Sequence, residues 1–306
     1  MIDMTGFFAS GPRRAAADIE AELQWAAAAL NHGRPDEAER FARNVLAAIP
    51  QHAKALYLLG CALLRQNRAS EAVPPLEKAA RALQDPEVET QLGVALRDIG
   101  RTEDALLRLR RASKRRPAYA QAFHELGYLL FSLQRAGEAI TAVEQGLKLV
   151  PGAVELWNLL GVIHHCQRDC ARARAAFSQA LTLAPDHPGA HYGMGAVMLD
   201  EADYAPAAEH LRRSLASNSG DAQARLKLGV SLLELGQTED AVENFRAAVR
   251  SEPMAYRLAL TLISGSARGR FWLRPSAAAK HLGLSLSASA PGISRGRDPF
   301  LWQRHR

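Results

Sequence analysis

The sequence predicts an all-α protein built from repeated pairs of helices, and three recurring features carry this prediction. A small residue that follows a large apolar residue returns every 33 or 34 residues, at Ala26, Gly60, Gly93, Gly127, Gly161, Gly195 and Gly229. An alanine follows each of them after twelve residues, at Ala38, Ala72, Ala105, Ala139, Ala173, Ala207 and Ala241. Most units then end on proline, at Pro50, Pro117, Pro151, Pro185 and Pro253. Recurrence at one fixed period predicts modules that stack side by side.

Each unit carries two stretches of helical periodicity separated by a short break. In the third unit, Leu92, Leu96 and Ile99 follow one another at spacings of four and three, which places them on one helix face. Glycine marks the break at Gly33, Gly100 and Gly236. The recurring small residue lets the two helices of a unit approach closely. We therefore expect a bulky residue at Gly161 to overpack the unit, at a cost of about 1–3 kcal/mol.

This pattern resembles the tetratricopeptide repeat, and the fifth unit is the fullest match. It reads Trp157-x2-Leu160-Gly161, then Ala173-x3-Phe177, then Pro185. The resemblance implies a right-handed α-solenoid of helix-turn-helix repeats, with a concave face made mainly from the first helix of each repeat. Seven repeats are expected over residues 19–253, with boundaries at 19–52, 53–85, 86–119, 120–153, 154–187, 188–221 and 222–254.

The flanks of the repeats differ from the repeats themselves. Residues 1–18 are expected to form a flexible N-terminus and residues 255–265 a capping helix. Residues 266–306 are expected to form a basic tail that is partly disordered, in which Phe271-Trp272-Leu273 covers the capping helix. Pro74 and Pro75 are expected near the start of a second helix, where missing N–H groups cost least.

Composition and charge narrow the class of protein. The net charge of +6 belongs to residues 266–306, which sum to +7 and leave about −1 for residues 1–265; this disfavours a nucleic-acid surface on the repeats. Three cysteines cannot form a disulfide framework and favour a reducing compartment. The chain has no apolar run long enough to span a bilayer, and the order of apolar and basic residues at its start does not fit a secretory signal. We therefore expect a cytoplasmic protein.

Catalytic and metal-binding motifs are weak in this sequence. One cluster contains residues of the types that bind zinc, namely His164-His165-Cys166 with Cys170, four residues on from Cys166. The helix phase places His164 on the core side, and the expected break near Arg168 spoils the spacing of the two thiols. We therefore expect no metal site, no catalytic residues and no cofactor, and so a protein that is not an enzyme.

The concave face is the candidate site. Repeat phase directs eleven side chains toward it, and they are suited to holding an extended peptide or a helix of a protein partner. They are Lys54, Tyr57, Arg65, Gln121, His124, Tyr128, Phe131, Asn158, His165, Tyr192 and Lys227.

Two specialisations of the family are not supported. The clamp of chaperone-tail binders is missing, because Thr90, Val94 and Glu125 occupy the relevant places. The asparagine ladder of the glycosyltransferase-linked type is missing as well, since Asn158 is displaced from it by one residue.

The sequence thus predicts a non-enzymatic interaction scaffold. Two alternatives stay open. One is an accessory or truncated module of a repeat-linked sulfotransferase or glycosyltransferase system. The other is a nucleic-acid-associated protein that acts through the basic tail.

Overall fold

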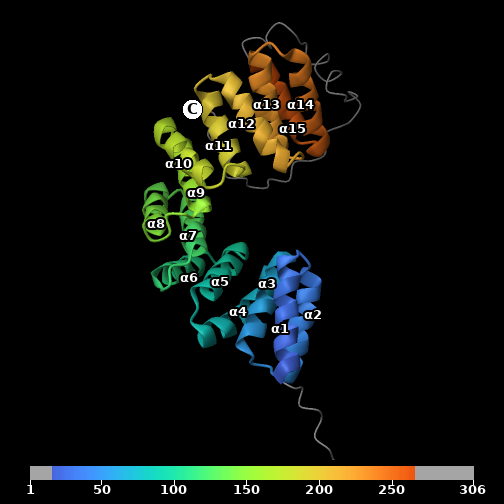
Figure 1. The fold of residues 1–306 in the computed structure, drawn as a ribbon, viewed down its shortest axis with the longest axis vertical. Coiled ribbons are helices and arrows are strands. Elements are labelled where there is room, and N and C mark those ends of the chain that lie inside the picture. Colours follow the sequence, from blue (N-terminus) through green and yellow to red (C-terminus); the bar gives the residue numbers. More distant parts are fainter. Residues whose placement is uncertain (1–15, 266–306) are drawn as a thin grey trace, which may run out of the picture. The chain divides into compact units, whose positions relative to one another are not determined.

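The computed structural model describes residues 16–265, which form fifteen α-helices and no strand (Figure 1). The helices are α1 (Ala16–Asn31), α2 (Pro35–Ala48), α3 (Ala53–Arg65), α4 (Ala69–Leu83), α5 (Pro86–Asp98), α6 (Thr102–Lys114), α7 (Ala120–Ser132), α8 (Ala136–Leu149), α9 (Val154–Cys166), α10 (Cys170–Leu183), α11 (Pro188–Asp200), α12 (Tyr204–Ser217), α13 (Ala222–Glu234), α14 (Thr238–Ser251) and α15 (Ala255–Gly265). The all-α prediction is confirmed.

The described helices fall into two compact units. The first runs to Leu133 and includes Lys148–Val150, and the second comprises Gln134–Leu147 and the chain from Pro151 onward. In each unit a first helix packs on the second helix of its own pair, as in α3 with α4 and α11 with α12. The second helix then packs on the next first helix, and successive first helices also touch, as in α3 with α5 and α9 with α11.

We keep seven repeats as the proposed division of the chain. The odd-numbered helices α3 to α13 begin at residues 53, 86, 120, 154, 188 and 222, where the second to seventh repeats were placed. Helix α1 already begins at Ala16, inside the segment 1–18 that was expected to be flexible. Helix α15 packs against α13 and α14. The tail, with Phe271-Trp272-Leu273, lies outside the described residues.

The recurring residues form the core. All seven alanines of the series from Ala38 to Ala241 have 0% exposure. The residues four positions later also have 0% exposure, namely Ala42, Leu76, Leu109, Val143, Phe177, Leu211 and Phe245. The small residue of the first helix lies against this second series: a Cβ on Gly161 would be 2.6 Å from Phe177 Cε1. The close approach predicted at Gly161 is confirmed.

The turn inside every repeat uses a left-handed residue. Glycine supplies it at Gly33, Gly100 and Gly236, and other residues supply it at Asn67, Gln134, Arg168 and Ala202. The residue after the turn then bonds back across the helix end, as Arg34 N does to Ala29 O at 2.8 Å and Asp203 N to Met198 O at 2.8 Å. This is the Schellman arrangement, which satisfies the last carbonyls of the first helix and reverses the chain.

The prediction for Pro74 and Pro75 was wrong in one respect. Helix α4 begins at Ala69, so both prolines lie beyond the first four residues, inside the helix. Each therefore removes a backbone hydrogen bond of the helix instead of replacing an N–H that has no helical partner.

Candidate functional site

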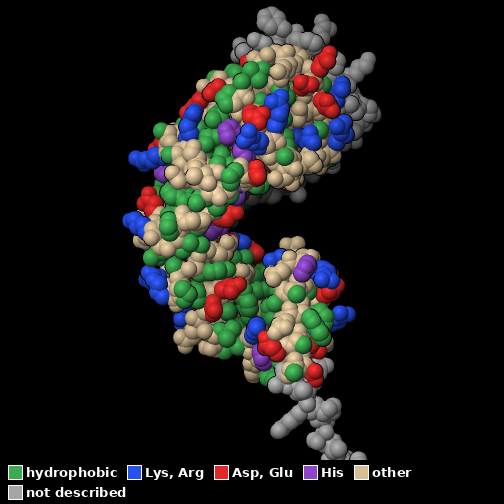
Figure 2. Space-filling model, in the orientation of Figure 1, with side chains coloured by type: hydrophobic (Ala, Val, Ile, Leu, Met, Phe, Trp, Pro, Cys, Tyr) green, Lys and Arg blue, Asp and Glu red, His purple; other side chains and the backbone are tan. Residues whose placement is uncertain are grey.

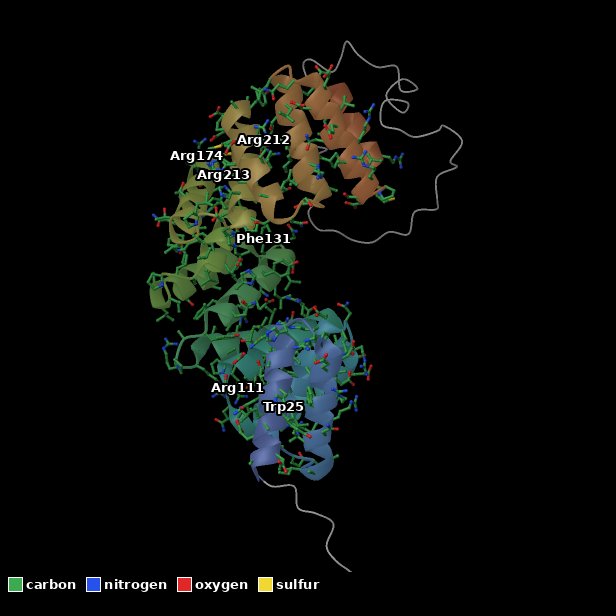
Figure 3. All side chains as sticks on the ribbon, turned by 45° about the vertical axis from the view of Figure 1, so that its right-hand side comes forward. Trp25, Arg111, Phe131, Arg174, Arg212 and Arg213 are labelled. Carbon is green, nitrogen blue, oxygen red and sulfur yellow. The ribbon has the colours of Figure 1, made fainter. Side chains whose placement is uncertain are left out.

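The structure places all eleven predicted binding residues on first helices. Lys54, Tyr57 and Arg65 lie on α3, and Gln121, His124, Tyr128 and Phe131 on α7; Asn158 and His165 lie on α9, Tyr192 on α11 and Lys227 on α13. Lys54 and Arg65 are exposed, and the other nine are half-buried. The first seven belong to the first unit and the last four to the second, so that each unit has its own first-helix surface. Figure 3 shows the side chains, with Phe131 labelled.

On the first unit, α3 is joined to both of its neighbours by polar side chains. Lys54 Nζ lies 3.7 Å from Glu20 of α1, and Arg65 donates to Leu30 O at 3.3 Å. On the other side, Tyr57 Oη donates to Glu87 of α5 at 2.7 Å. Burial and the neighbouring Cys61 and Glu87 raise the pKa of Tyr57, so it stays a neutral donor.

A tighter cluster joins α5 to α7. Arg97 donates to Glu125 at 2.6 Å and lies 5.6 Å above the ring of Tyr128. Gln121 donates to the other oxygen of Glu125, also at 2.6 Å. Burial alone would raise the pKa of Glu125, but His124 and Arg97 outweigh it and lower that pKa. The carboxylate is therefore ionised near neutral pH and holds the guanidinium against the tyrosine face.

One nitrogen beside this cluster lacks a hydrogen bond among the described residues. His124 Nδ1 is buried and lies 3.6 Å from Glu125, too far for a hydrogen bond. Tyr119, the residue before α7, borders the same region, and burial and the charge of Glu87 raise its pKa to about 12.

The second unit repeats this design with other residues. His165 of α9 lies 3.0 Å from Asp200 of α11, and Arg168 approaches the same carboxylate at 3.6 Å. The hydrogen bond to His165 lowers the pKa of Asp200. Between α11 and α13, Lys227 Nζ lies 5.8 Å from the ring centroid of Tyr192.

Asn158 lies close to the start of the next first helix. Its side-chain nitrogen would be 3.1 Å from a Cβ added at Gly189, and its Oδ1 is buried without a hydrogen bond among the described residues. A buried amide oxygen of this kind costs about 1–3 kcal/mol.

Sequence reasoning missed the partners of these side chains. The residues it did not name as site residues are Glu87, Arg97, Tyr119, Glu125 and Asp200. A signal was present, since the paired residues lie 28 to 35 positions apart, about one repeat. A search for a basic residue and an acid about one repeat apart on first helices would have found Arg97 with Glu125 and His165 with Asp200, but not Glu87 or Tyr119.

The metal cluster does not assemble. His164 is 5% exposed, which confirms its predicted core position, and His165 is paired with Asp200. Cys166 and Cys170 are half-buried free thiols. Over residues 16–265, no three His, Cys, Asp or Glu side chains are grouped so that they could hold a metal ion.

Charges of both signs are interspersed over the face shown in Figure 2. Many form short ion pairs within one helix or turn, such as Arg101 with Asp104 at 2.7 Å. Within residues 16–265, no helix has the length and apolar character that a membrane span requires.

The fold and this surface define a class of protein: a helical-repeat protein whose first helices present a row of half-buried aromatic and polar side chains. The sequence model of the tetratricopeptide repeat matches residues 23–86, 90–154, 124–188, 167–222, 192–255 and 226–264. The chain belongs to the tetratricopeptide repeat family.

Solved structures share the fold. The Cut9-Hcn1 hetero-tetramer of the APC/C matches with a TM-score of 0.67 and 18% identity, over 79% of this chain and 49% of that chain. The chain therefore spans about half the length of that relative, 49%. A tetratricopeptide repeat protein from Parabacteroides merdae matches with a TM-score of 0.60 and 17% identity, over 81% of this chain and 99% of that one.

A third structure is the human IFIT1 dimer with m7Gppp-AAAA, with a TM-score of 0.64 and 14% identity, over 80% of this chain and 63% of that one. Identities this low show an all-α solenoid fold and nothing about a ligand. No curated protein gives a significant match to the chain.

Proposed function

We propose that the protein is a non-enzymatic interaction scaffold that binds an extended or helical segment of a protein partner on its first-helix surfaces. Membership of the tetratricopeptide repeat family supports a protein partner. Free thiols at Cys61, Cys166 and Cys170 support a reducing, cytoplasmic location.

One observation carries the proposal: the tyrosines gather on these surfaces. Of the six tyrosines in the chain, Tyr57, Tyr119, Tyr128 and Tyr192 lie on a first helix or directly before one, and all four are half-buried. Tyrosine is enriched at protein interfaces, since it offers a large apolar face together with a hydroxyl at low entropic cost.

The contacts already described support binding in a second way. Tyr57, Tyr128 and Tyr192 are each held by a neighbour, namely Glu87, Arg97 and Lys227. A side chain that is already held loses less rotamer freedom when a partner docks, so more of the contact energy remains as affinity.

The proposal is tested by affinity capture with the full chain as bait. The Tyr128→Ala/Asn158→Ala variant removes one half-buried side chain from each surface, and Tyr204→Ala, on the second helix α12, is the matched control. We expect wild type and Tyr204→Ala to capture the same proteins and the double variant to lose a defined subset. The loss of a contact that contributes about 1–3 kcal/mol would weaken binding by roughly 5- to 150-fold.

Two results decide the matter. Equal circular dichroism of the three proteins shows that the fold is kept. If wild type and the double variant captured identical sets of proteins, the first-helix surfaces would not be the binding site.

A further inference from the structure

A buried acidic residue in the third repeat is surrounded by arginines of the second helix, α6. Glu89 of α5 is 0% exposed. In the second and fourth repeats the same position holds the buried apolar residues Leu56 and Phe123. A carboxylate in such a place needs partners of opposite charge, because an unpaired buried charge is strongly unfavourable.

Three arginines supply these partners, and we call Arg108, Arg111 and Arg115 the arginine cluster. Arg108 donates to one oxygen of Glu89 at 3.4 Å, and Arg111 Nε lies 3.3 Å from the other oxygen. Arg115, the residue after α6, approaches that second oxygen at 3.8 Å. Figure 3 labels Arg111 among the side chains of the first unit. Within residues 16–265, Glu89 is the only acid that pairs with the cluster.

The cluster carries more positive charge than Glu89 requires. Three arginines and one carboxylate leave a formal charge of +2. The cluster lies at the C-terminal end of α6, where the helix dipole adds a negative charge of about 0.5. Neutralisation of Glu89 and the helix dipole therefore leave about +1.5 without a counter-charge.

The hydrogen-bonding capacity of the cluster is also in excess. Each guanidinium has five N–H donors, whereas its contact with Glu89 is single and long for a hydrogen bond. Arg115 Nε is buried and has no hydrogen bond among the described residues. Arg111 is 53% exposed, so the cluster can be reached from the surface. Unused donors beside an uncompensated positive charge favour an anion that brings several acceptors.

We propose that the arginine cluster binds the phosphate group of a phosphorylated serine or threonine on a protein partner. Such a group carries a charge of about −1.5 to −2 at pH 7 and three acceptor oxygens, which matches the excess of the cluster in charge and in donors. Arginine is suited to this ligand because its planar fork pairs with two phosphate oxygens at once.

The compactness of the cluster favours a single phosphate group over a nucleic acid. All three guanidinium groups lie within 3.8 Å of one carboxylate, whereas a nucleic acid needs a basic track along its backbone. Residues 1–265 sum to about −1, which does not favour such a track. A protein segment is also favoured over free phosphate, since the residues around the phosphate can add contacts beside an open site.

This inference goes beyond the proposed function, because it uses arginines carried by and following a second helix and does not depend on the first-helix surfaces. The test measures fluorescence anisotropy with the full chain and the fluorescein-labelled peptide Gly-Gly-phosphoserine-Gly-Gly. Peptides with serine or glutamate in place of phosphoserine are the ligand controls. We expect the phosphopeptide to bind about tenfold or more tightly than either control peptide, because only phosphate supplies a compact dianion.

Arg111→Gln should weaken phosphopeptide binding by about tenfold, since it removes a charged fork and leaves an exposed polar side chain. Arg101→Gln is the matched control, because Arg101 also belongs to the third repeat but is paired one to one with Asp104. It should bind the phosphopeptide as wild type does. The Tyr128→Ala/Asn158→Ala variant should do so as well, which separates this site from the first-helix surfaces. Circular dichroism establishes that each variant keeps its helices.

The other outcomes overturn the proposal. Equal binding of the phosphopeptide and the glutamate peptide would show that the cluster does not recognise phosphate. An unchanged affinity in Arg111→Gln, or an equal loss in Arg101→Gln, would show that the cluster is not the site. Displacement of the phosphopeptide by an equal concentration of inorganic phosphate would identify the free ion as the ligand, and tighter binding of an oligouridylate would identify a nucleic acid.

Discussion

A close contact between a small and a large residue sets the separation of the two helices in a repeat. A Cβ added at Gly161 would lie 2.6 Å from Phe177, one at Gly195 2.8 Å from Leu211, and one at Gly229 2.8 Å from Phe245. The first repeat has Ala26 in the small position, and there the larger partner is replaced by Ala42. The two positions therefore share one limited volume.

Gly161→Val tests this volume limit. We expect it to lower the free energy of unfolding by about 1–3 kcal/mol, because the added methyl groups meet the ring of Phe177. Gly137→Val is the matched control, since no atom lies within 4 Å of a Cβ at Gly137. Its effect in urea denaturation should stay within about 0.5 kcal/mol. Equal losses for the two variants would contradict the volume limit.

A pair of histidines makes the second unit sensitive to acid. His191 Nε2 lies 2.8 Å from Pro185 O, so it carries the proton, and its Nδ1 accepts from His210 Nδ1 at 2.9 Å. Burial, His191 and Arg213 lower the pKa of His210, and burial lowers that of His164. The unfolded chain then binds more protons in acid, so stability is complete above about pH 6.5 and is lost as the pH falls.

His210→Asn should weaken this pH dependence. The expected result is a smaller drop in the urea midpoint between about pH 7.5 and about pH 5.5 than in wild type. The midpoints are read from circular dichroism at the two pH values. If the urea midpoint of the variant fell as much as that of wild type, His210 would not contribute to the pH dependence of stability.

At the scale of the element, the turn between the paired helices is the most regular feature. The left-handed residue recurs through all seven turns, from Gly33 with φ 68° to Gly236 with φ 80°. Glycine adopts this conformation without a steric penalty and asparagine adopts it more readily than the other residues, for which the penalty is about 1–2 kcal/mol. Three turns carry that penalty, at Gln134, Arg168 and Ala202, and a fourth carries a smaller one at Asn67.

Ala202→Gly should therefore stabilise the protein. The expected gain is about 1 kcal/mol, since the Cβ of an alanine has no compensating contact in a left-handed turn. Gly33→Ala, at φ 68° with no atom within 4 Å of its Cβ, isolates the reverse change and should destabilise by a similar amount. Thermal melting gives the melting temperature of each variant. A shift of the same sign for Ala202→Gly and Gly33→Ala would contradict the idea that the left-handed conformation destabilises alanine at these turns.

The sequence predicts the fold more completely than it predicts the candidate site. The helices follow from local signals, because small residues, alanines and prolines recur at fixed spacing and fix each unit. The candidate side chains follow from helix phase. Their partners do not, since Arg97 with Glu125 and His165 with Asp200 depend on how neighbouring first helices lie side by side. The position of Pro74 and Pro75 inside a helix was not predicted either, because helix α4 begins earlier than the prolines suggested.

At the scale of the whole molecule, stability is a sum of contacts between neighbours. In each unit, helices pack mainly on helices close to them in the chain order, and the chain divides into two compact units. Repeat proteins of this kind need not unfold in one step, because the loss of one pair of helices removes only the contacts of its neighbours.

Calorimetry should show this directly. We expect the van't Hoff enthalpy of thermal unfolding to be smaller than the calorimetric enthalpy, which marks more than one transition. Gly161→Val lies in the second unit and should shift one part of the profile more than the other. A single transition with equal enthalpies would show that the chain unfolds as one cooperative body.

The left-handed turns also offer places for spectroscopic labels. Asn67 in the first unit and Ala202 in the second are exposed, and each already holds a side chain in this backbone conformation. Cysteine at Ala202 would add no new steric demand on the backbone, and at Asn67 it would add only a small one. Since the three native thiols are half-buried, a donor dye and an acceptor dye at these sites would report, by energy transfer, the spacing of the two units before and after a partner docks.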